Sequence, residues 1–356
     1  MSSTLSKFAA SWQSAVVCVA TGLALLVGLP TVIDDYTLIE VTIYLVMAML
    51  AVSLGFIWGF GGILCFGQAA FFGLGSYTYA IAVVNMGDST VPFLLSIAVP
   101  ALFAVILGYV IFYGRLSDVY MGVITLTVTL ILFNLVNSTA GPEWKIGSAP
   151  LGGFNGIPAI PPLNWPGNTD ETITPRGMFN LSLGLLILVY AGLRLLIASR
   201  VGHVIVAIKE NEQRAQLLGY DARAYKLFVF TLGGAIAGLA GCLFANWGSF
   251  TSPTIFGLAQ SAQIIIWVIV GGLGTLVGPV VGCILVQWLT TQIGTQQTFN
   301  SNLVLGAILL LFVLLVPKGL VPSIGDFLRR MWSRRSSRSR QAREPQAAVR
   351  VEEQQA

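Results

Sequence analysis

The sequence predicts an all-α, polytopic membrane protein with about ten transmembrane helices in two related five-helix halves and both termini in the cytoplasm. Of its 356 residues, 55% are hydrophobic and only 10% are charged, whereas about a quarter of the residues of a soluble domain carry charge. The apolar residues form runs of about 20, the length that crosses a bilayer as a helix. Lysine and arginine are concentrated between alternate runs, which indicates the cytoplasmic side.

The apolar runs define the expected spans. They lie at about 13–33, 37–57, 62–84, 91–113, 119–139, 177–198, 226–247, 258–275, 278–294 and 301–317. The first run follows Lys7 and has a secretory signal as its alternative. It is long for a signal, no small-residue cleavage site follows it, and another span comes directly after it, so a retained helix is predicted.

The basic residues set the orientation. With a cytoplasmic N-terminus and ten alternating spans, only Lys145 and Arg176 fall outside. A shift by one span would put the basic 200–226 segment and the basic C-terminal tail on opposite sides, which the positive-inside rule disfavours. The sequence therefore predicts an inner (plasma) membrane protein whose basic tail marks the cytoplasmic side and contacts lipid, and which binds no nucleic acid.

The chain divides into a transmembrane domain, 1–328, and a polar, arginine-rich tail, 329–356, which is predicted to be disordered. Residues 141–176 form a Pro- and Gly-rich external loop, expected to be turns and short irregular pieces ordered against the protein, with a disordered linker as the alternative. Residues 199–226 form the main cytoplasmic segment.

The cytoplasmic segment predicts a short amphipathic helix. Ile205, Ile208, Ala215 and Leu218 keep approximate helical spacing on one face. Gly219 is suited to close this helix in the left-handed conformation, and Asp221 to cap the helix that follows. The pattern fits either a connector on the membrane surface or an element that docks a partner protein.

The sequence lacks motifs for metal binding, catalysis or nucleotide binding. The four cysteines lie in apolar runs without ligand spacing, and a lone His203 cannot build a metal site, so no metal is expected. No span pairs carboxylates, histidines or a nucleophile with a base, so an enzyme is not expected. The phosphate-binding G-x-x-x-x-G-K-[ST] motif is absent as well. If ATP drives this protein, another subunit binds it.

Several ordered motifs resemble those of the bacterial ABC-importer permeases for branched-chain amino acids and urea, in the branch of the second, longer permease of the heteromeric pair. The motifs are W-G-x-x-G followed by GQAAFFGLGSY, AIKENEQRAQLLGYDARAYKLFVF, GGAIAGLAG, VIVGGLGTLVGPVVG and FVLLVPKGLVP. They cover roughly residues 40–322. The resemblance implies a pore shared with a homologous second permease, two cytoplasmic ATPase subunits that bind ATP and Mg, and a periplasmic substrate-binding protein. This chain itself would hold no cofactor.

The resemblance also implies a coupling segment at about 204–218. Its contacts and shape-setting residues would be Ile208, Glu210, Glu212, Arg214, Leu218 and Gly219. The chain departs from the general coupling pattern, because Gln213 and Arg214 stand where small residues follow the glutamate.

The glycine-rich stretches predict close helix packing, because small residues let backbones approach where lipid provides no hydrophobic drive. The candidates are Gly59, Gly62, Gly67, Gly75, Gly271, Gly274 and Gly278. A broken helix whose carbonyls face a polar path is the alternative, and Pro279 is expected to end or kink a helix. One such stretch lies in each half, as two related halves would place them.

Gln68, Asn134 and Gln263 are the candidates for a polar translocation path, with hydrogen bonds between helices as the alternative for each. Branched-chain amino acids are the first expectation for the substrate, and urea or short-chain amides the second. A gated channel without an ATPase is a third possibility, and it would need no cytoplasmic docking helix.

Overall fold

The structure is a computed structural model that describes residues 20–294 except 23, 27, 31–32, 115, 117, 142 and 166–167, together with 306 and 319–323. In this part of the chain, six helices are long and apolar enough to cross a membrane. They are α2 (Asp35–Gly59), α3 (Gln68–Met86), α4 (Thr90–Tyr113), α5 (Asp118–Asn137), α6 (Pro175–Ala198) and α9 (Ala222–Gly248). The predicted tail 329–356 lies outside the described residues, as does nearly all of the span at 301–317.

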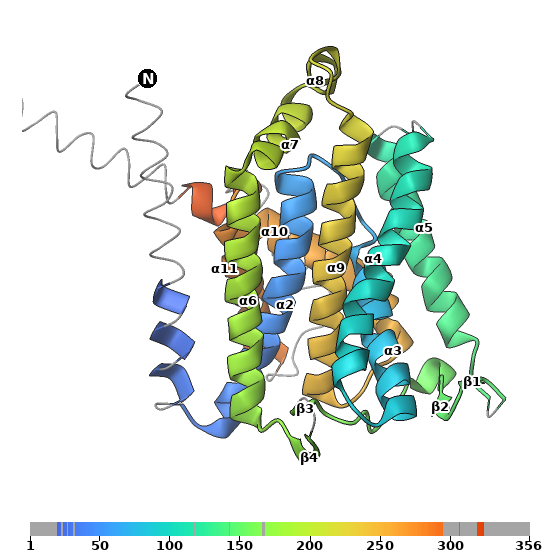
Figure 1. Cartoon of the computed structure of the whole chain (residues 1–356). Coiled ribbons are helices and arrows are strands. Elements are labelled where there is room, and N and C mark those ends of the chain that lie inside the picture. The colour runs from blue at the N-terminus through green and yellow to red at the C-terminus, as the bar shows by residue number, and fades with distance from the viewer. Residues whose placement is uncertain are drawn as a thin grey trace, which may run out of the picture.

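Helix α2 forms the centre of the bundle. Its residues are apolar on every side, and most are buried from Thr42 onward, as expected for a helix surrounded by others. It packs against α6, α9, α10 and α11, whereas α4 and α5 lie toward one edge with their outer faces exposed (Figure 1). The core is therefore built around α2, α3 and α9.

The span predicted at 62–84 is wrong in its first part. Helix α2 ends at Gly59, and α3 begins only at Gln68, so the segment 60–67 is not helical. Gly62 has a φ of 69°, a left-handed conformation that stops a right-handed helix. Backbone N–H groups of the segment 60–67 donate to acceptors elsewhere. The N–H of Ile63 donates to the carbonyl oxygen of Ile57 at 3.2 Å, and the N–H of Phe66 donates to Thr125 Oγ1 at 3.2 Å. Non-helical backbone is tolerated here because Ile63 and its neighbours are enclosed by protein.

The segment between α5 and α6, which is predicted to be external and is called the external segment below, folds against the helix ends. It contains two short antiparallel hairpins, β1 (Lys145–Ile146) with β2 (Ala149–Pro150) and β3 (Asn164–Trp165) with β4 (Asn168–Thr172), and the 3-10 turn η1 (Gly153–Asn155). The sequence indicated turns but not these strands. Ile157 forms a bridge with Thr251, and Asn164 Oδ1 accepts the backbone N–H of Ser89 at 2.9 Å. These bonds fix the segment at one end of the bundle.

The cytoplasmic segment predicted from its charges lies at the opposite end (Figure 1). It contains two short helices, α7 (Arg200–Glu210) and α8 (Glu212–Leu217), and the chain then returns through α9. Within the described residues, the basic segment and the external hairpins are thus separated by the whole length of the helices.

The last described helices form a tight pair. A 3-10 turn, η2 (Pro253–Phe256), leads into α10 (Leu258–Gly271), and α11 (Val277–Gly294) follows. The 14 residues of α10 extend about 21 Å, less than the roughly 30 Å of a hydrocarbon core, so the prediction of a full span at 258–275 is wrong. Pro279 neither ends nor kinks a helix: it lies in the first turn of α11, where a missing N–H is tolerated.

Candidate coupling and translocation sites

The hairpin of α7 and α8, which is predicted to be cytoplasmic, owes its shape to capping residues. Ser199 caps α7, and Asn211 caps α8 by accepting the backbone N–H of Arg214 at 2.9 Å. As predicted, Gly219 adopts the left-handed conformation, with a φ of 89°, and Asp221 caps α9. The side-chain oxygens of these caps satisfy N–H groups that a helix start leaves without partners. The sequence therefore specifies two short helices with defined ends.

The expectation of one helix with Leu218 on the same face as Ile208 and Ala215 is wrong. Asn211 has extended backbone angles, φ −159° and ψ 99°, so the helix stops there and restarts. Ile208 and Ala215 still pack together in a small buried cluster with Ala222, but the break turns the end of α8 outward. Leu218 is 77% exposed as a result.

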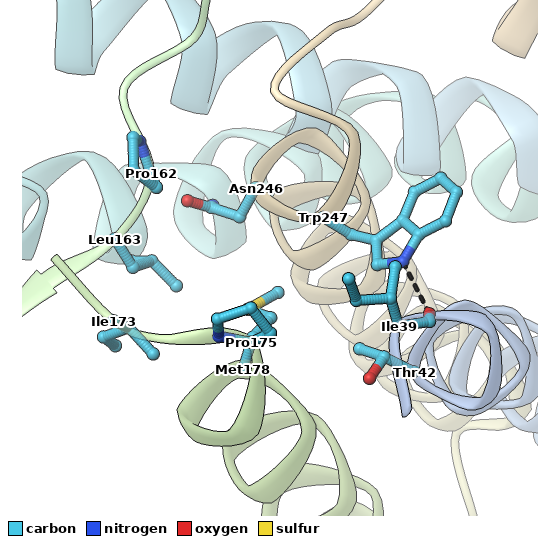
Figure 2. A pocket seen from close by; sticks show the side chains of 9 residues that line it. All are labelled: Ile39, Thr42, Pro162, Leu163, Ile173, Pro175, Met178, Asn246 and Trp247. Carbon is cyan, nitrogen blue, oxygen red and sulfur yellow. Dashed lines mark hydrogen bonds between the residues drawn. The ribbon is translucent and has the colours of Figure 1, made fainter. Parts of the chain in front are cut away.

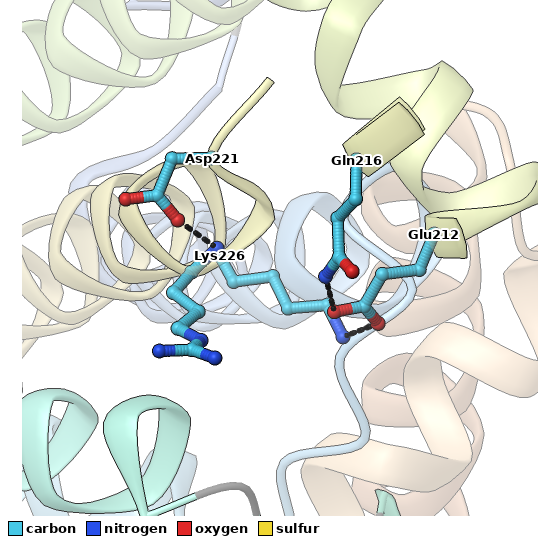
Figure 3. A network of polar contacts seen from close by, with 5 residues as sticks. Glu212, Gln216, Asp221 and Lys226 are labelled. Atoms are coloured by element: carbon cyan, nitrogen blue, oxygen red, sulfur yellow. Dashed lines mark hydrogen bonds and ion pairs between the residues drawn. The ribbon is translucent and has the colours of Figure 1, made fainter. Parts of the chain in front are cut away.

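Two basic side chains tie this hairpin to the membrane helices. Lys209 Nζ donates to the carbonyl oxygen of Gly59 at 2.7 Å, at the C-terminal end of α2. That carbonyl has no acceptor role within its own helix, and a cation there also offsets the negative end of the helix dipole. Glu212 pairs with Lys226 at 2.6 Å and also accepts from Gln216 (Figure 3). The hairpin is thus bonded directly to both α2 and α9.

The outer tip of the hairpin is both apolar and charged. Leu217 is 87% exposed beside Leu218, and Glu210 and Arg214 are exposed as well. Two adjacent leucines thus form an exposed apolar tip beside charged side chains. Among the predicted coupling residues, Ile208 faces inward, Glu212 is engaged by Lys226, and Glu210, Arg214 and Leu218 face outward.

The three candidates for the translocation path occupy different environments. Gln68 is 1% exposed, and its amide donates to Ser53 Oγ at 2.7 Å and to the carbonyl of Gly233 at 3.1 Å. Gln263 is partly buried and donates to Gln287 Oε1 at 3.3 Å. Asn134 lies on the exposed side of α5 and donates to a carbonyl of its own helix. The structure does not bring these three side chains together, and their role in a path stays a prediction.

Five of the seven predicted packing glycines lie at close backbone contacts. A Cβ at Gly75 would be 2.2 Å from the carbonyl oxygen of Gly238, and one at Gly59 would be 3.0 Å from the backbone nitrogen of Gly274. Two further contacts of this kind join Gly67 to Thr125 and Gly271 to Gly278. Gly62 and Gly274 lie outside helices, where their positive φ values shape the loops.

Comparison with known proteins gives a direct match. Residues 36–314 match the family described as the branched-chain amino acid transport system permease component. This chain belongs to that family. It is 28% identical over 329 residues to the high-affinity branched-chain amino acid transport system permease protein LivM of Escherichia coli K12, covering 84% of this chain and 73% of that protein.

Other relatives extend the comparison. LivM of Salmonella typhimurium LT2 is 26% identical over the same shares of the two chains. The xylose transport system permease protein XylH of Escherichia coli K12 is 30% identical over 145 residues, which cover 39% of this chain and 37% of XylH. No solved structure matches. The permease is thus a multi-pass protein of the bacterial inner membrane.

Sequence reasoning missed three residues of the permease that the structure brings forward. Lys209 was counted only as a cytoplasmic charge, and Leu217 was not considered. Asn246, near the external end of α9, was passed over within an apolar span. An isolated amide in such a span was the available signal, because polar side chains inside membrane helices seek specific partners. Within the described residues, no three His, Cys, Asp or Glu side chains are placed to hold a metal ion.

Proposed function

We propose that this chain is one of two permease subunits of an ATP-driven importer and translocates branched-chain amino acids across the inner membrane. The family match over residues 36–314 and the names of the LivM relatives support this substrate. The partners are a homologous second permease, two cytoplasmic ATPase subunits that bind ATP and Mg, and a periplasmic substrate-binding protein. This chain contributes the membrane path and no ATP site.

The exposed tip of α8 is the observation that supports the binding of a separate ATPase subunit. Leu217 and Leu218 are exposed at the end of α8, which lies at the end of the bundle opposite the 141–176 segment (Figure 1). Full burial of a leucine side chain stabilises a complex by about 1.5–3 kcal/mol. In the proposal, an ATPase subunit covers both leucines, and the charged side chain of Arg214 sets the orientation of docking.

The contacts of the hairpin provide the route of coupling. A displacement of α7 pulls on Gly59 through Lys209, and Gly59 immediately precedes the non-helical segment 60–67. A displacement of α8 acts on α9 through the Glu212–Lys226 ion pair. Because α2 and α9 flank Gln68, both routes end at the same buried amide.

Copurification tests the proposal. The tagged chain is expressed with its neighbouring ATPase and second-permease genes, and the amount of ATPase retained is measured for Leu217→Ser/Leu218→Ser. The proposal expects at least a tenfold loss of ATPase, because two apolar contacts are removed. Phe154→Ser is the matched control: Phe154 is also exposed, at 65%, but lies in the external segment, so retention should stay unchanged.

An ATPase that never copurifies with the wild-type chain, together with solute flux without ATP, would favour the gated channel instead. The substrate is tested separately by calorimetric titration of the cognate binding protein with leucine, valine and urea. Binding of leucine and valine supports the proposal. Binding of urea alone would move the assignment to the urea and short-chain amide importers.

A further inference from the structure

Two sides of α2 differ in polarity at the end that carries the external segment. On one side, a cavity of about 150 Å³ lies between α2, α6, α9 and the external segment (Figure 2). Its lining includes Ile39 and Thr42 of α2 and Asn246 and Trp247 of α9, and none of the lining residues is charged. Trp247 Nε1 donates to the carbonyl of Ile39 at 2.8 Å. A charged solute would lose its hydration in this cavity without gaining a counter-charge.

The side of α2 that packs against α11 is polar. Glu40 lies in the second turn of α2. The hydroxyl of Tyr44 is within hydrogen-bond distance of two acceptors, 2.8 Å from Glu40 Oε1 and 3.0 Å from Thr291 Oγ1 on α11. One turn further along α11, Gln287 Oε1 accepts the side-chain amide of Gln263 on α10 at 3.3 Å. These five residues are called the polar row below.

The polar row leads from the external end into the bundle. Tyr44 is four residues beyond Glu40 on α2, and Gln287 is four residues before Thr291 on α11, which runs antiparallel to α2. At 1.5 Å per residue, the two steps together extend about 12 Å along the helices. All members except Tyr44 keep part of their surface accessible. Carboxylate and amide side chains on membrane helices face the bundle interior or a water-filled cavity, so this face borders water.

Glu40 carries the charge of the polar row. Arg176 pairs with the exposed Asp35, one turn before Glu40, and within the described residues no lysine or arginine forms an ion pair with Glu40 itself. A carboxylate on a membrane helix is costly unless a cation or water compensates it. The α-ammonium group of an amino acid supplies such a cation, whereas urea and short-chain amides carry none.

We propose that the polar row lines the substrate path on this subunit and that Glu40 receives the ammonium group of the amino acid at the external mouth. This inference rests on the proposed function and gives the path a place between α2, α10 and α11. Of the three predicted path residues, Gln263 belongs to the polar row, whereas Gln68 and Asn134 lie elsewhere.

Modification of introduced cysteines tests the path. The full-length chain with Cys18→Ser is coexpressed with the second permease and placed in lipid nanodiscs; the cysteines left in the described part are buried, namely Cys65, Cys242 and Cys283. Single variants Gln287→Cys and Thr291→Cys are treated with a cationic reagent, trimethylammonioethyl methanethiosulfonate, and with the anionic sulfonatoethyl methanethiosulfonate. Leu188→Cys is the control, because Leu188 is 66% exposed on the apolar side of α6.

Both reagents should modify Gln287→Cys and Thr291→Cys about tenfold or more faster than Leu188→Cys, because the reaction needs water and a thiolate. At low ionic strength, adding Glu40→Gln to Gln287→Cys should lower the ratio of the cationic to the anionic rate by about threefold or more. This is the effect of removing one unit charge about 12 Å away in water, and a lower local dielectric increases it.

Leucine uptake by the whole importer in proteoliposomes tests the ammonium site. Glu40→Gln keeps an acceptor for the Tyr44 hydroxyl but should lower kcat/KM by about tenfold or more, as expected for loss of a hydrogen bond between charged groups. Asp35→Asn is the matched control. It neutralises an exposed carboxylate at the same end of α2, so its effect should be about twofold or less.

Two thiol results overturn the path: rates at Gln287→Cys and Thr291→Cys no higher than at Leu188→Cys, or a rate ratio that Glu40→Gln leaves unchanged. Uptake by Glu40→Gln equal to that by Asp35→Asn overturns the ammonium site. Failure of the proposed function is a different result, namely a wild-type importer without ATP-dependent leucine uptake. That result would remove the ammonium site as well, whereas the thiol rates need neither ATP nor leucine.

Discussion

Replacing Gly75 with alanine tests a close contact between α3 and α9. The new Cβ would lie 2.2 Å from the carbonyl oxygen of Gly238 and 2.5 Å from its Cα. Ordinary contact begins near 3.4 Å, so α3 and α9 must separate by roughly 1 Å. A gap of this size forfeits a quarter to a half of the dispersion energy of the atoms facing it. These atoms include the paired rings Phe71–Phe230 and Phe72–Phe244.

The expected cost is about 1–3 kcal/mol of unfolding free energy, the range for overpacked cores. Alanine's helix propensity alone acts in the other direction, by about 1 kcal/mol. Gly184→Ala is the matched control, because a Cβ at Gly184 in α6 meets no atom within 4 Å. The unfolding free energy of both purified variants is measured by titration with sodium dodecyl sulfate in mixed micelles. A Gly75→Ala variant as stable as Gly184→Ala or more so would refute the close approach of α3 and α9.

Three further substitutions have defined outcomes. Gln68→Leu removes the donor to Ser53 and Gly233 and should cost about 1–3 kcal/mol of unfolding free energy; unchanged stability with lost transport would instead place the amide in the path. Lys209→Met keeps the aliphatic stem but removes the charged donor to Gly59, and hydrogen exchange of the amides around 60–67 should rise by about tenfold, whereas an unchanged rate would mean that the bond does not hold this segment. Glu212→Gln breaks the ion pair with Lys226 and should cost about 1 kcal/mol or less because the carboxylate is partly exposed, as denaturation followed at the hairpin would show.

The sequence predicted the helices and caps whose formation depends on residues close together in the chain. Apolar runs identified α2, α4, α5, α6 and α9, because lipid requires about 20 apolar residues regardless of the partners of a helix. Gly219 and Asp221 were assigned correctly to helix ends, because caps depend on backbone groups within three residues.

Periodicity gave wrong predictions in two places where a helix is interrupted. The 60–67 segment is apolar enough for a span. A positive φ at Gly62 and a hydrogen bond to Thr125 on α5 stabilise a non-helical backbone there instead. Leu218 kept the helical spacing, yet Asn211 ended the helix before it. Neither outcome follows from periodicity, because periodicity assumes one continuous helix.

The sequence by itself determined that this protein lies in a membrane, because hydropathy is a property of composition and order. The side that carries the basic hairpin and the binding of ATP by another chain stay predictions from charge and motif content. Only the tertiary structure decided that Lys209 reaches Gly59, that Gly75 lies against Gly238 and that Gln68 donates to Ser53 and Gly233. These relations join residues far apart in the chain, so they exist only after packing has brought their helices together.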